Sequence, residues 1–328
     1  MKMLKNTEIR RLQSLFNINI FSVREVGKSV NDTYNLICDK GTFALRKTIE
    51  TLYYGLKQAI SEYFLLQKFN SKSSLQIIKP YMPPKKDGNN IYFMTHWVFG
   101  NKFDGSDHHR INAAKYLAKL HDELNKLDFT IEEGPADSYI DDLLSGKRSN
   151  HIDFNRYYKY TKKPSEKKIL SFLEKLTQNM ADGSKNYQKH LGIKEIVHGD
   201  PRAENLIFTQ RKVLSIIDFQ GVRKDYPISD VAWAISTGFC KNELDQIDLE
   251  KMKKFLVAYL SIRKLDGLKL LPSIIKIRHI RGLETIFYFK FIKKDYRPQL
   301  TKNKDYSINL LEWLDHNQQK IEDIIEKL

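Results

Sequence analysis

Two aspartates and one asparagine of this chain stand beside apolar runs that read as strands. Asp200 follows an apolar run that ends at Val197, and Asn205 comes five residues after Asp200. Asp218 lies near the end of a second apolar run, from Val213 to Phe219, which is reached through a polar turn. We therefore expect the three side chains at neighbouring loop mouths, pointing the same way. There one carboxylate can accept a hydroxyl proton, while the other two groups hold Mg²⁺ against phosphate oxygens.

The wider pattern of HGDPRAEN, then IDF, then SDVAWAI carries a family resemblance. It resembles the aminoglycoside phosphotransferase, choline kinase and homoserine kinase group, which has the protein-kinase-like fold. The resemblance implies that Asp200 is the catalytic base and that Asn205 and Asp218 bind the metal. It also implies that His198 braces the loop, and that Asp230, which opens the following helix, is structural.

Composition narrows the class of protein further. The 328 residues are 41% apolar and 12% aromatic, enough to build a sizeable core in two lobes. No run approaches the roughly 18 apolar residues of a membrane helix, and the opening MKMLKNTEIRRLQ lacks the apolar region of a secretory signal. Cys38 and Cys240 offer neither a disulfide framework nor metal-ligand spacing. We expect a cytoplasmic protein with no membrane partner and with both cysteines reduced and buried.

The net charge of +15, from 55 basic and 40 acidic residues, is typical of proteins that bind nucleic acid or acidic membranes. However, the basic residues are mostly lysines scattered along predicted helices, as in KKPSEKK and KMKK, and no nucleic-acid-binding motif accompanies them. We interpret them as a solvated surface and expect no nucleic-acid partner. Nucleic-acid binding stays as an alternative.

The first third of the chain reads as a strand-rich unit. After a helix capped by Asn6 or Thr7, strands are predicted over 20–26, 33–38 and 42–47. In the resembling family, the polar loop between the first two strands covers the phosphates of ATP with backbone N–H groups. The cofactor-binding residues implied there are Ser29 and Asn31. An ordinary hairpin turn is the alternative.

The third predicted strand must present a cation to the phosphates. Arg46 takes the place of the family's lysine, while Lys47 is the alternative if the register is shifted by one residue. Glu62, on a helix predicted over 58–69, stands where the family's glutamate pairs with this cation; a surface glutamate is the alternative. Arg202 stands where protein kinases often carry a lysine, so the resemblance gives it a catalytic role at the transferred phosphate.

Two further strands are predicted over 76–80 and 91–97, around the turn KKDGNN. Thr95, His96 and Trp97 would form the hinge whose backbone groups bind adenine. The chain then divides into a nucleotide-binding lobe, residues 1–98, and a catalytic and acceptor-binding lobe, residues 99–328. This is an α+β, bilobal fold, with a small antiparallel β lobe and a larger, mostly helical one.

The second lobe reads as helical. A strong amphipathic helix begins near Asp107, and His121 within it reads as a structural histidine. Helices follow over 136–144 and 167–180, joined by a tyrosine-rich stretch from 151 to 163, and again over 231–239, 249–262, 272–293 and 307–327. Arg278 and Arg281, with Glu284 beyond, read as a solvent-exposed row; the alternative is that they face the acceptor.

These features together predict an ATP- and Mg²⁺-dependent kinase for a hydroxyl of a small metabolite. The segment 141–190, which in the family shapes the acceptor site, is basic: it holds eleven lysines and arginines against six acidic residues. Such a field favours a sugar, an amino sugar, or an amino-acid-like or amino-alcohol acceptor such as homoserine over a polycation. The alternatives are an aminoglycoside kinase, a protein kinase and a nucleotide-binding pseudokinase.

Overall fold

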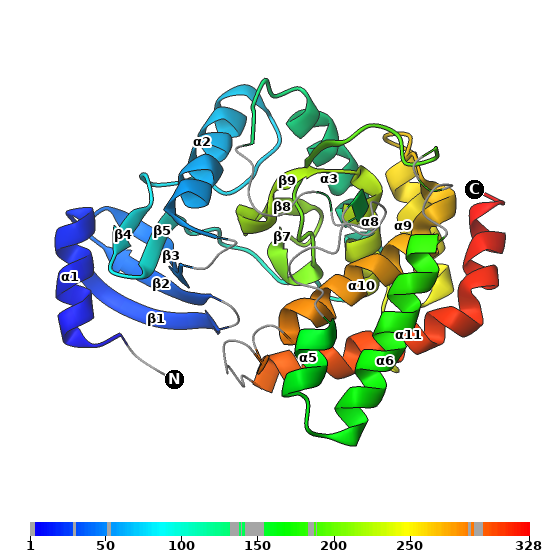
Figure 1. The fold of residues 1–328 in the computed structure, drawn as a ribbon. Coiled ribbons are helices and arrows are strands. Elements are labelled where there is room, and N and C mark those ends of the chain that lie inside the picture. The colour runs from blue at the N-terminus through cyan, green and yellow to red at the C-terminus, as the bar shows by residue number, and fades with distance from the viewer. Residues whose placement is uncertain are drawn as a thin grey trace.

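A computed structural model describes residues 4–28, 31–50, 54–131, 138, 140–141, 154–182, 187, 189–287, 290–291 and 298–328. Figure 1 shows a small sheet-containing lobe beside a larger helical lobe. This confirms the predicted α+β, bilobal fold. None of the helices in the described ranges combines the length and apolar character that a membrane span requires.

The small lobe is built on one antiparallel sheet with the strand order β1-β2-β3-β5-β4. Its strands are β1 (Ile20–Lys28), β2 (Asp32–Cys38), β3 (Gly41–Ile49), β4 (Lys85–Asp87) and β5 (Asn90–His96). The first three predicted strands are therefore confirmed, with slightly longer ends. In the register across β2, β3 and β5, Arg46 lies between Thr33 and Phe93.

The fourth predicted strand, over 76–80, was wrong. Only Pro80 of that stretch forms a bridge, to Thr95, and the fourth strand is instead β4, inside the predicted KKDGNN turn. The buried Ile77 and Ile78 belong to the main core, and the N–H of Ile78 donates to the carbonyl of Ile216 in the other lobe. The apolar residues of 76–80 thus pack between the lobes. Pro80 can lie at the edge of the sheet because proline has no N–H to donate to a further strand.

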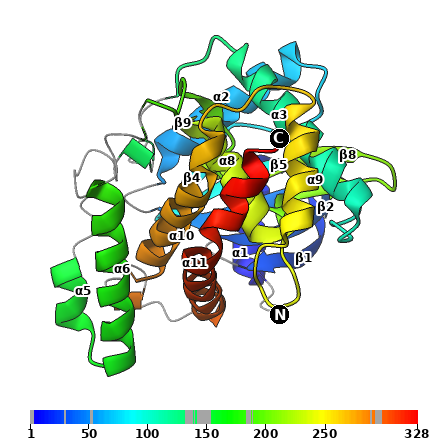
Figure 2. The same cartoon turned by 90° about the vertical axis from the view of Figure 1, so that its right-hand side faces the viewer.

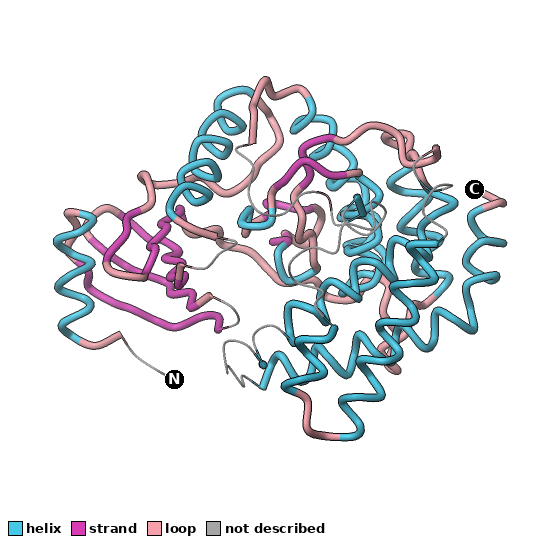
Figure 3. The backbone as a smooth tube through the Cα atoms, viewed as in Figure 1, coloured by secondary structure: helices cyan, strands magenta, loops and turns pink. Residues whose placement is uncertain are grey.

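Two helices flank this sheet. The helix α1 (Asn6–Phe16) lies on the far side of the sheet from the helical lobe, as Figure 3 shows. Its buried Leu12 and Phe16 pack against strand residues that alternate on that face, among them Leu36, Phe43, Leu45 and Met94. Lys5, with no side-chain capping bond, precedes the helix, so the predicted cap at Asn6 or Thr7 was wrong.

The helix α2 (Leu56–Lys72) lies between the sheet and the helical lobe in Figure 1. The predicted stripe is confirmed, because Tyr63, Leu66 and Phe69 are buried in the core that continues into the large lobe, and Ala59 is buried beside them. The helix thus ties the two lobes together along one face while presenting Glu62 toward the sheet.

The large lobe is mostly helical and encloses two short two-stranded sheets. Its helices are α3 (Asp107–Asn125), α5 (Phe154–Tyr160), α6 (Pro164–Asp182), α8 (Pro227–Ala234), α9 (Leu249–Leu260), α10 (Leu271–Phe287) and α11 (Pro298–Ile325). In Figure 2, α10 and α11 lie between α6 and α9. One sheet pairs β6 (Glu195–Val197) with β9 (Arg223–Asp225), and the other pairs β7 (Leu206–Phe208) with β8 (Val213–Ile216).

Several boundaries differ from the predictions in this lobe. The tyrosine-rich stretch over 151–163 contains the helix α5 instead of a plain linker. The strand predicted to reach Phe219 ends at Ile216, because a 3₁₀ turn (Phe219–Gly221) follows Asp218. The predicted helix over 136–144 lies mostly outside the described residues. Cys38 and Cys240 are free and buried, as predicted.

Candidate active site

The loop between β6 and β7 is held by one buried carboxylate. Asp230, on α8, accepts hydrogen bonds from the backbone N–H groups of His198 and Gly199, both at 2.9 Å, and contacts Nε2 of His121 at 3.2 Å. Burial by itself would raise the pKa of Asp230, but the hydrogen bond to His121 and nearby positive charge leave it lowered. A charged, fully bonded carboxylate of this kind agrees with the structural role predicted for Asp230.

His198 links the loop after β6 to the segment that follows β8. Its Nε2 lies 3.0 Å from the carbonyl oxygen of Ile217, and its Nδ1 accepts the backbone N–H of Asp200 at 3.2 Å. Burial lowers the pKa of His198 despite the surrounding aspartates, so the ring is neutral near pH 7. The ring therefore fixes the start of the loop against the segment that carries Asp218, which is the bracing predicted for it.

The glycine of this loop has a specific geometric reason. Gly199 has φ +83°, and a Cβ built there would lie 1.9 Å from the carbonyl oxygen of Gly221. No side chain fits at that distance, and the backbone conformation disfavours one in any case. The loop and the turn after Asp218 can approach each other only because a glycine stands at this position.

Asp200 is surrounded by hydrogen-bond donors. Arg202 forms an ion pair with it: Nη2 donates to Oδ2 at 2.9 Å, while Nε lies 2.8 Å from Oδ1 without the geometry of a hydrogen bond. Asn205 Nδ2 lies 3.2 Å from Oδ2, and Trp233 Nε1 lies 2.6 Å from Oδ1. The charge of Asp200 raises the pKa of Arg202. The structure thus places Arg202 beside the predicted base itself, and its role at a phosphate stays a prediction.

The two predicted metal ligands have different partners: Asn205 contacts Asp200, whereas Asp218 contacts Arg46. Asn205 is oriented by its Nδ2, which donates to the Asp200 carbonyl at 2.8 Å, so its Oδ1 faces away from that contact. Asp218 adopts a left-handed backbone conformation with φ +63°, which aspartate tolerates better than most residues. Its Oδ1 accepts from Arg46 at 3.0 Å.

Arg46 and Lys47 point to opposite faces of the sheet, as strand alternation requires. Arg46 donates to Glu62 Oε1 at 3.0 Å and Oε2 at 2.5 Å, and also to Asp218. Lys47 lies on the α1 face, where its Nζ is 2.6 Å from Glu8. Glu62 is 1% exposed, so it is not a surface glutamate. The geometry therefore supports Arg46, and not Lys47, as the cation on the site side of the strand.

A buried tyrosine completes this ion-pair network. The hydroxyl of Tyr54 donates to Glu62 Oε2 at 2.6 Å and also contacts Arg46. Burial alone would lower the pKa of Arg46, but Glu62, Tyr54 and Asp218 together leave it raised. The guanidinium is thus permanently charged and held in place by partners within the protein.

The predicted phosphate loop is only partly within the described residues. Ser29 lies outside them. Asn31 is buried: its Nδ2 donates to Gln220 at 2.5 Å, and its Oδ1 accepts from Thr48 at 2.9 Å. Both ends of the amide are therefore committed within the protein, and Asn31 links the loop to the turn directly after Asp218. Binding of a nucleotide by Asn31 stays a prediction.

In the predicted hinge, the backbone N–H groups of His96 and Trp97 already bond to carbonyl groups within the protein. Thr95 lies beside Ala44 in the sheet register, on the same face as Arg46. The N–H of His96 donates to the Lys79 carbonyl at 2.8 Å, and that of Trp97 donates to the Thr42 carbonyl at 3.0 Å. The expectation that these two N–H groups are offered to adenine is therefore not met in this arrangement.

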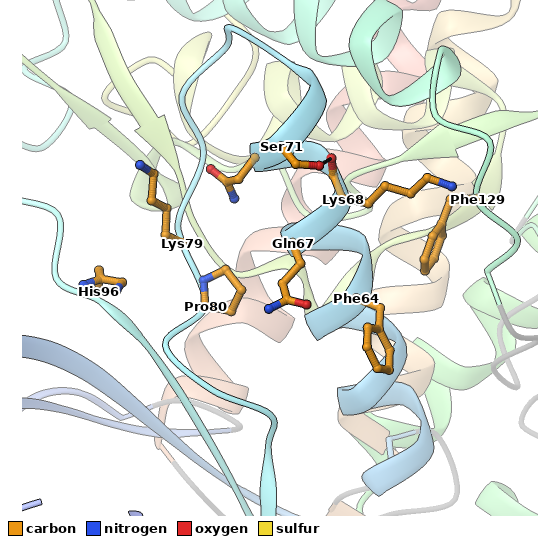
Figure 4. Close-up of a pocket in the computed structure, with 9 residues that line it drawn as sticks. Phe64, Gln67, Lys68, Ser71, Lys79, Pro80, His96 and Phe129 are labelled. Carbon is orange, nitrogen blue, oxygen red and sulfur yellow. Dashed lines mark hydrogen bonds between the residues drawn. The ribbon is translucent and has the colours of Figure 1, made fainter.

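The side chain of His96 also turns away from the catalytic residues. Its ring packs near Phe43 and Tyr81, on the α1 face of the sheet, and borders a shallow hollow of about 820 Å³ along α2 (Figure 4). That hollow is lined by Phe64, Gln67, Lys68, Asn70, Ser71, Lys79, Pro80, His96 and Phe129. Apart from His96, none of the predicted site residues lines it, so it is separate from the catalytic loop.

The arginines of α10 are not a solvent-exposed row. Arg278 and Arg281 are 4% and 8% exposed, and Glu284 is buried with them. Arg278 Nη2 donates to the Gly199 carbonyl at 2.7 Å, and Arg281 pairs with Glu284 at 2.9 Å. The three-residue spacing places two arginines on one helix face, but it does not reveal that this face packs against the catalytic loop.

Three residues of the site were missed by sequence reasoning: Tyr54, Gln220 and Trp233. The contact of Trp233 with Asp200 spans 33 positions of sequence, and no local pattern signals it. Tyr54 stands between elements and carries no periodic signal.

Together, a strand-rich lobe with a buried Arg46–Glu62 pair and a helical lobe with the Asp200 loop define a protein-kinase-like phosphotransferase fold. A sequence model described as "Phosphotransferase enzyme family" matches residues 30–265. The chain belongs to this family. A homoserine kinase from Methylobacillus flagellatus is 26% identical over 147 residues, which cover 42% of this chain and 44% of that protein. The match therefore spans less than half the length of that relative.

Solved structures show the same fold at low sequence identity. A microcompartment-associated aminopropanol kinase superposes with a TM-score of 0.70 at 16% identity, covering 97% of this chain and 99% of that one. An ethanolamine kinase from Plasmodium vivax gives 0.63 at 12% identity, with 88% and 81% covered. The GDP and kanamycin complex of APH(2")-IIia gives 0.63 at 16% identity, with 95% and 99% covered. The predicted family resemblance and fold are confirmed.

Proposed function

We propose that the chain is an ATP- and Mg²⁺-dependent kinase that phosphorylates a hydroxyl of a small metabolite. The observation that carries this proposal is the chain of contacts from Glu62 through Arg46 to Asp218, and from Asn205 to Asp200. These contacts from both lobes support the proposed roles of Arg46 as phosphate-binding cation, Asn205 and Asp218 as metal ligands, and Asp200 as base. Phosphoryl transfer requires little beyond such positioned charges.

In the proposed reaction, Asp200 accepts the proton of the acceptor hydroxyl. The hydroxyl oxygen forms a bond to the terminal phosphorus of ATP, and the bond from that phosphorus to the bridging oxygen breaks to release ADP. Arg46 orients the phosphates from the sheet, while Arg202 keeps positive charge beside the reacting groups. Residues 1–98 would hold the nucleotide, and residues 99–328 would supply the base and the acceptor site.

The donor set suits Mg²⁺. Asn205 Oδ1 and the Asp218 carboxylate would hold the ion, which when bound neutralises charge on the phosphate oxygens. The described residues contain no cluster of three or more His, Cys, Asp or Glu side chains able to enclose a metal. Mg²⁺ in nucleotide sites is usually held by one or two protein oxygens plus phosphates and water, so a sparse set of this kind fits.

The inner face of the sheet supports a nucleobase site. Ala44 and Ile37 stand on the face that carries Arg46, because their strand neighbours Leu36, Phe43 and Leu45 face α1. Ile37 is 45% exposed, which leaves an apolar side chain uncovered on that face. A flat aromatic base would cover it. We propose that the base lies here, in contact with the hinge residues Thr95 and Trp97.

For the acceptor, we propose a neutral or carboxylate-bearing hydroxyl compound, such as a sugar or homoserine, in place of a polycation. Burying several ammonium groups requires carboxylate partners. The side chains around the Asp200 loop include the cations Arg202 and Arg278, with Arg281 one turn further along α10. A negative charge on the acceptor would be attracted there, and a polycation repelled.

The protein-kinase alternative finds no support in the fold. The segment from Asp218 to the start of α8 at Pro227 contains only a 3₁₀ turn and the three-residue strand β9. It leaves no room for an activation segment that would dock a protein substrate. The assembled Asp200, Asn205 and Asp218 likewise count against a pseudokinase, which has no use for all three.

ADP release measured in a coupled assay tests the proposal, with acceptors chosen in matched pairs. Homoserine differs from 3-aminopropanol, and serine from ethanolamine, only by a carboxylate. We expect the carboxylate-bearing member of an active pair, or a sugar, to be turned over preferentially. The Asp200→Asn variant serves as the control for contaminating kinases. Efficient turnover of kanamycin-like compounds alone would contradict the proposed acceptor class. The absence of turnover with every compound tested would contradict the proposed kinase activity.

A further inference from the structure

We propose that Trp233 is a positioning residue for Asp200, an inference that rests on the function proposed above. The indole Nε1 donates to Asp200 Oδ1 at 2.6 Å, the shortest of the contacts made to this carboxylate. An indole N–H is a donor only and does not titrate. It can therefore fix the orientation of a catalytic carboxylate without competing for the proton that the carboxylate must accept.

The distribution of donors around Asp200 shows what Trp233 adds. Oδ2 receives Nη2 of Arg202 and Nδ2 of Asn205, both from the loop itself. Oδ1 lies beside Nε of Arg202, which makes no hydrogen bond to it, and its donor comes from outside the loop: the indole of Trp233. Arg202 alone would allow the carboxylate and guanidinium to turn together. A donor anchored on α8 stops that rotation, so one oxygen of Asp200 stays aimed at the acceptor hydroxyl.

Trp233 is itself held from the side of α10. The Cζ of Arg278 lies 4.6 Å from the centre of the indole, and the ring of His279 lies at 5.1 Å. Gly282 borders the ring, because a Cβ built there would lie 3.9 Å from Cη2 of Trp233, an ordinary van der Waals contact. The Thr237 hydroxyl donates to the Trp233 carbonyl at 2.6 Å. The half-buried indole is thus held between its own helix, α8, and the facing helix α10.

Arg278 joins the two ends of this arrangement. The guanidinium that covers the indole also donates to the carbonyl of Gly199 at 2.7 Å, next to Asp200 in the chain. A cation on an aromatic face is an attractive contact, and it is stronger when desolvated. Arg278 therefore holds the backbone of the catalytic loop directly, at Gly199. It holds the carboxylate of Asp200 indirectly, through Trp233.

The first arm of the test measures turnover for Trp233→Phe, which keeps an aromatic ring beside Arg278 and removes the N–H together with part of the indole. We expect kcat to fall about tenfold, the usual effect of one hydrogen bond to a charged group, while acceptor KM and MgATP affinity stay within about twofold. Trp313→Phe on α11 is the matched control and should be unchanged. In an Asp200→Asn background, Trp233→Phe should alter the residual rate less than about twofold, because the group it positions is already lost.

Either of two results in this arm would overturn the proposal. One is a Trp233→Phe kcat within about twofold of wild type. The other is an equal tenfold loss with and without Asp200, which would show that the substitution acts on the fold and not through the carboxylate.

The second arm does not depend on activity. The three tryptophans of the chain give three indole N–H signals in a ¹⁵N-labelled sample, and Trp233→Phe identifies one of them. Asp200→Ala should shift that signal upfield and leave the Trp313 signal in place. If the wild-type protein transfers phosphate to no acceptor, the proposed function fails. This arm still shows whether the Trp233 indole is hydrogen-bonded to Asp200. A Trp233 signal that does not respond to Asp200→Ala overturns the inference.

Discussion

Replacing Arg46 by methionine should reveal two separate functions of that residue, stability and nucleotide binding. The substitution leaves Glu62, which is 1% exposed, without its ion-pair partner. Removing one member of a buried pair costs about 3–5 kcal/mol. Tyr54 still donates to Glu62, so we expect the lower end, about 3 kcal/mol of unfolding free energy. MgATP binding should weaken about 10- to 100-fold, because a charged donor to the phosphates is lost.

Lys47→Met is the matched control on the neighbouring residue of the same strand. Its partner Glu8 and Lys47 itself have side chains that are 24% and 20% exposed, so solvent screens the pair. We expect a loss of about 0.5 kcal/mol and unchanged MgATP affinity. The double variant Arg46→Met/Glu62→Met should regain most of the lost stability, because neither charge is then buried alone, yet it should still bind MgATP weakly.

Urea unfolding, monitored by fluorescence, measures the free energy of unfolding. Calorimetric titration with MgATP measures the nucleotide affinity independently. If Lys47→Met weakened MgATP binding more than Arg46→Met, the assignment of the strand cation would be wrong by one residue. If the double variant recovered both stability and affinity, Arg46 would be a purely structural residue.

Three further predictions concern the rest of the large lobe. Asp200→Asn should lower turnover roughly 10²–10⁴-fold and leave MgATP affinity unchanged in titrations, as expected for a lost base; near-normal turnover would remove Asp200 from the mechanism. Asp218→Ala should abolish the Mg²⁺ dependence of nucleotide binding, whereas a retained dependence would place the ion elsewhere. Burial, Arg278 and Lys241 lower the pKa of His279 from 6.5 to about 3. Between these pH values His279 is therefore protonated in the unfolded chain and neutral in the native chain. Stability should therefore fall as pH drops from 6.5 toward 3, by about 2 kcal/mol at pH 5, and His279→Gln should lack that component in pH-dependent unfolding.

Local sequence was sufficient for the elements whose partners are near in the chain. The strands β1, β2 and β3 alternate and are joined by short polar turns, so both their type and their pairing follow from the residues. The loop from His198 to Asn205 was predictable for the same reason, because its chemistry is carried by closely spaced polar groups between two apolar runs. Arg46 was preferred to Lys47 by its match to a family pattern, and the sheet register agrees.

The most consequential errors involve contacts between distant segments. Ile77 and Ile78 read as strand residues because they are apolar, but their partners are in the other lobe. The spacing of Arg278 and Arg281 shows that they share a helix face, while burial of that face depends on how α10 packs. The partners of Asn31 and Asp200, which are Gln220 and Trp233, lie 189 and 33 positions away. Only the folded chain reveals such pairs.

The position of Asp230 has a consequence for how a signature of this kind is interpreted. Its carboxylate bonds to His198 and Gly199, whereas the hydroxyl chemistry is assigned to Asp200. The sequence pattern therefore contains one aspartate that holds the loop, Asp230, and one proposed to react, Asp200. Mutation can remove either one separately. A gene copy that lost Asp200 would keep the loop in shape and would still match most of the signature. A copy that lost Asp230 would lose the loop while every proposed reacting group remained. The signature alone therefore reports descent and architecture, and activity must be judged at Asp200, Asn205 and Asp218 individually.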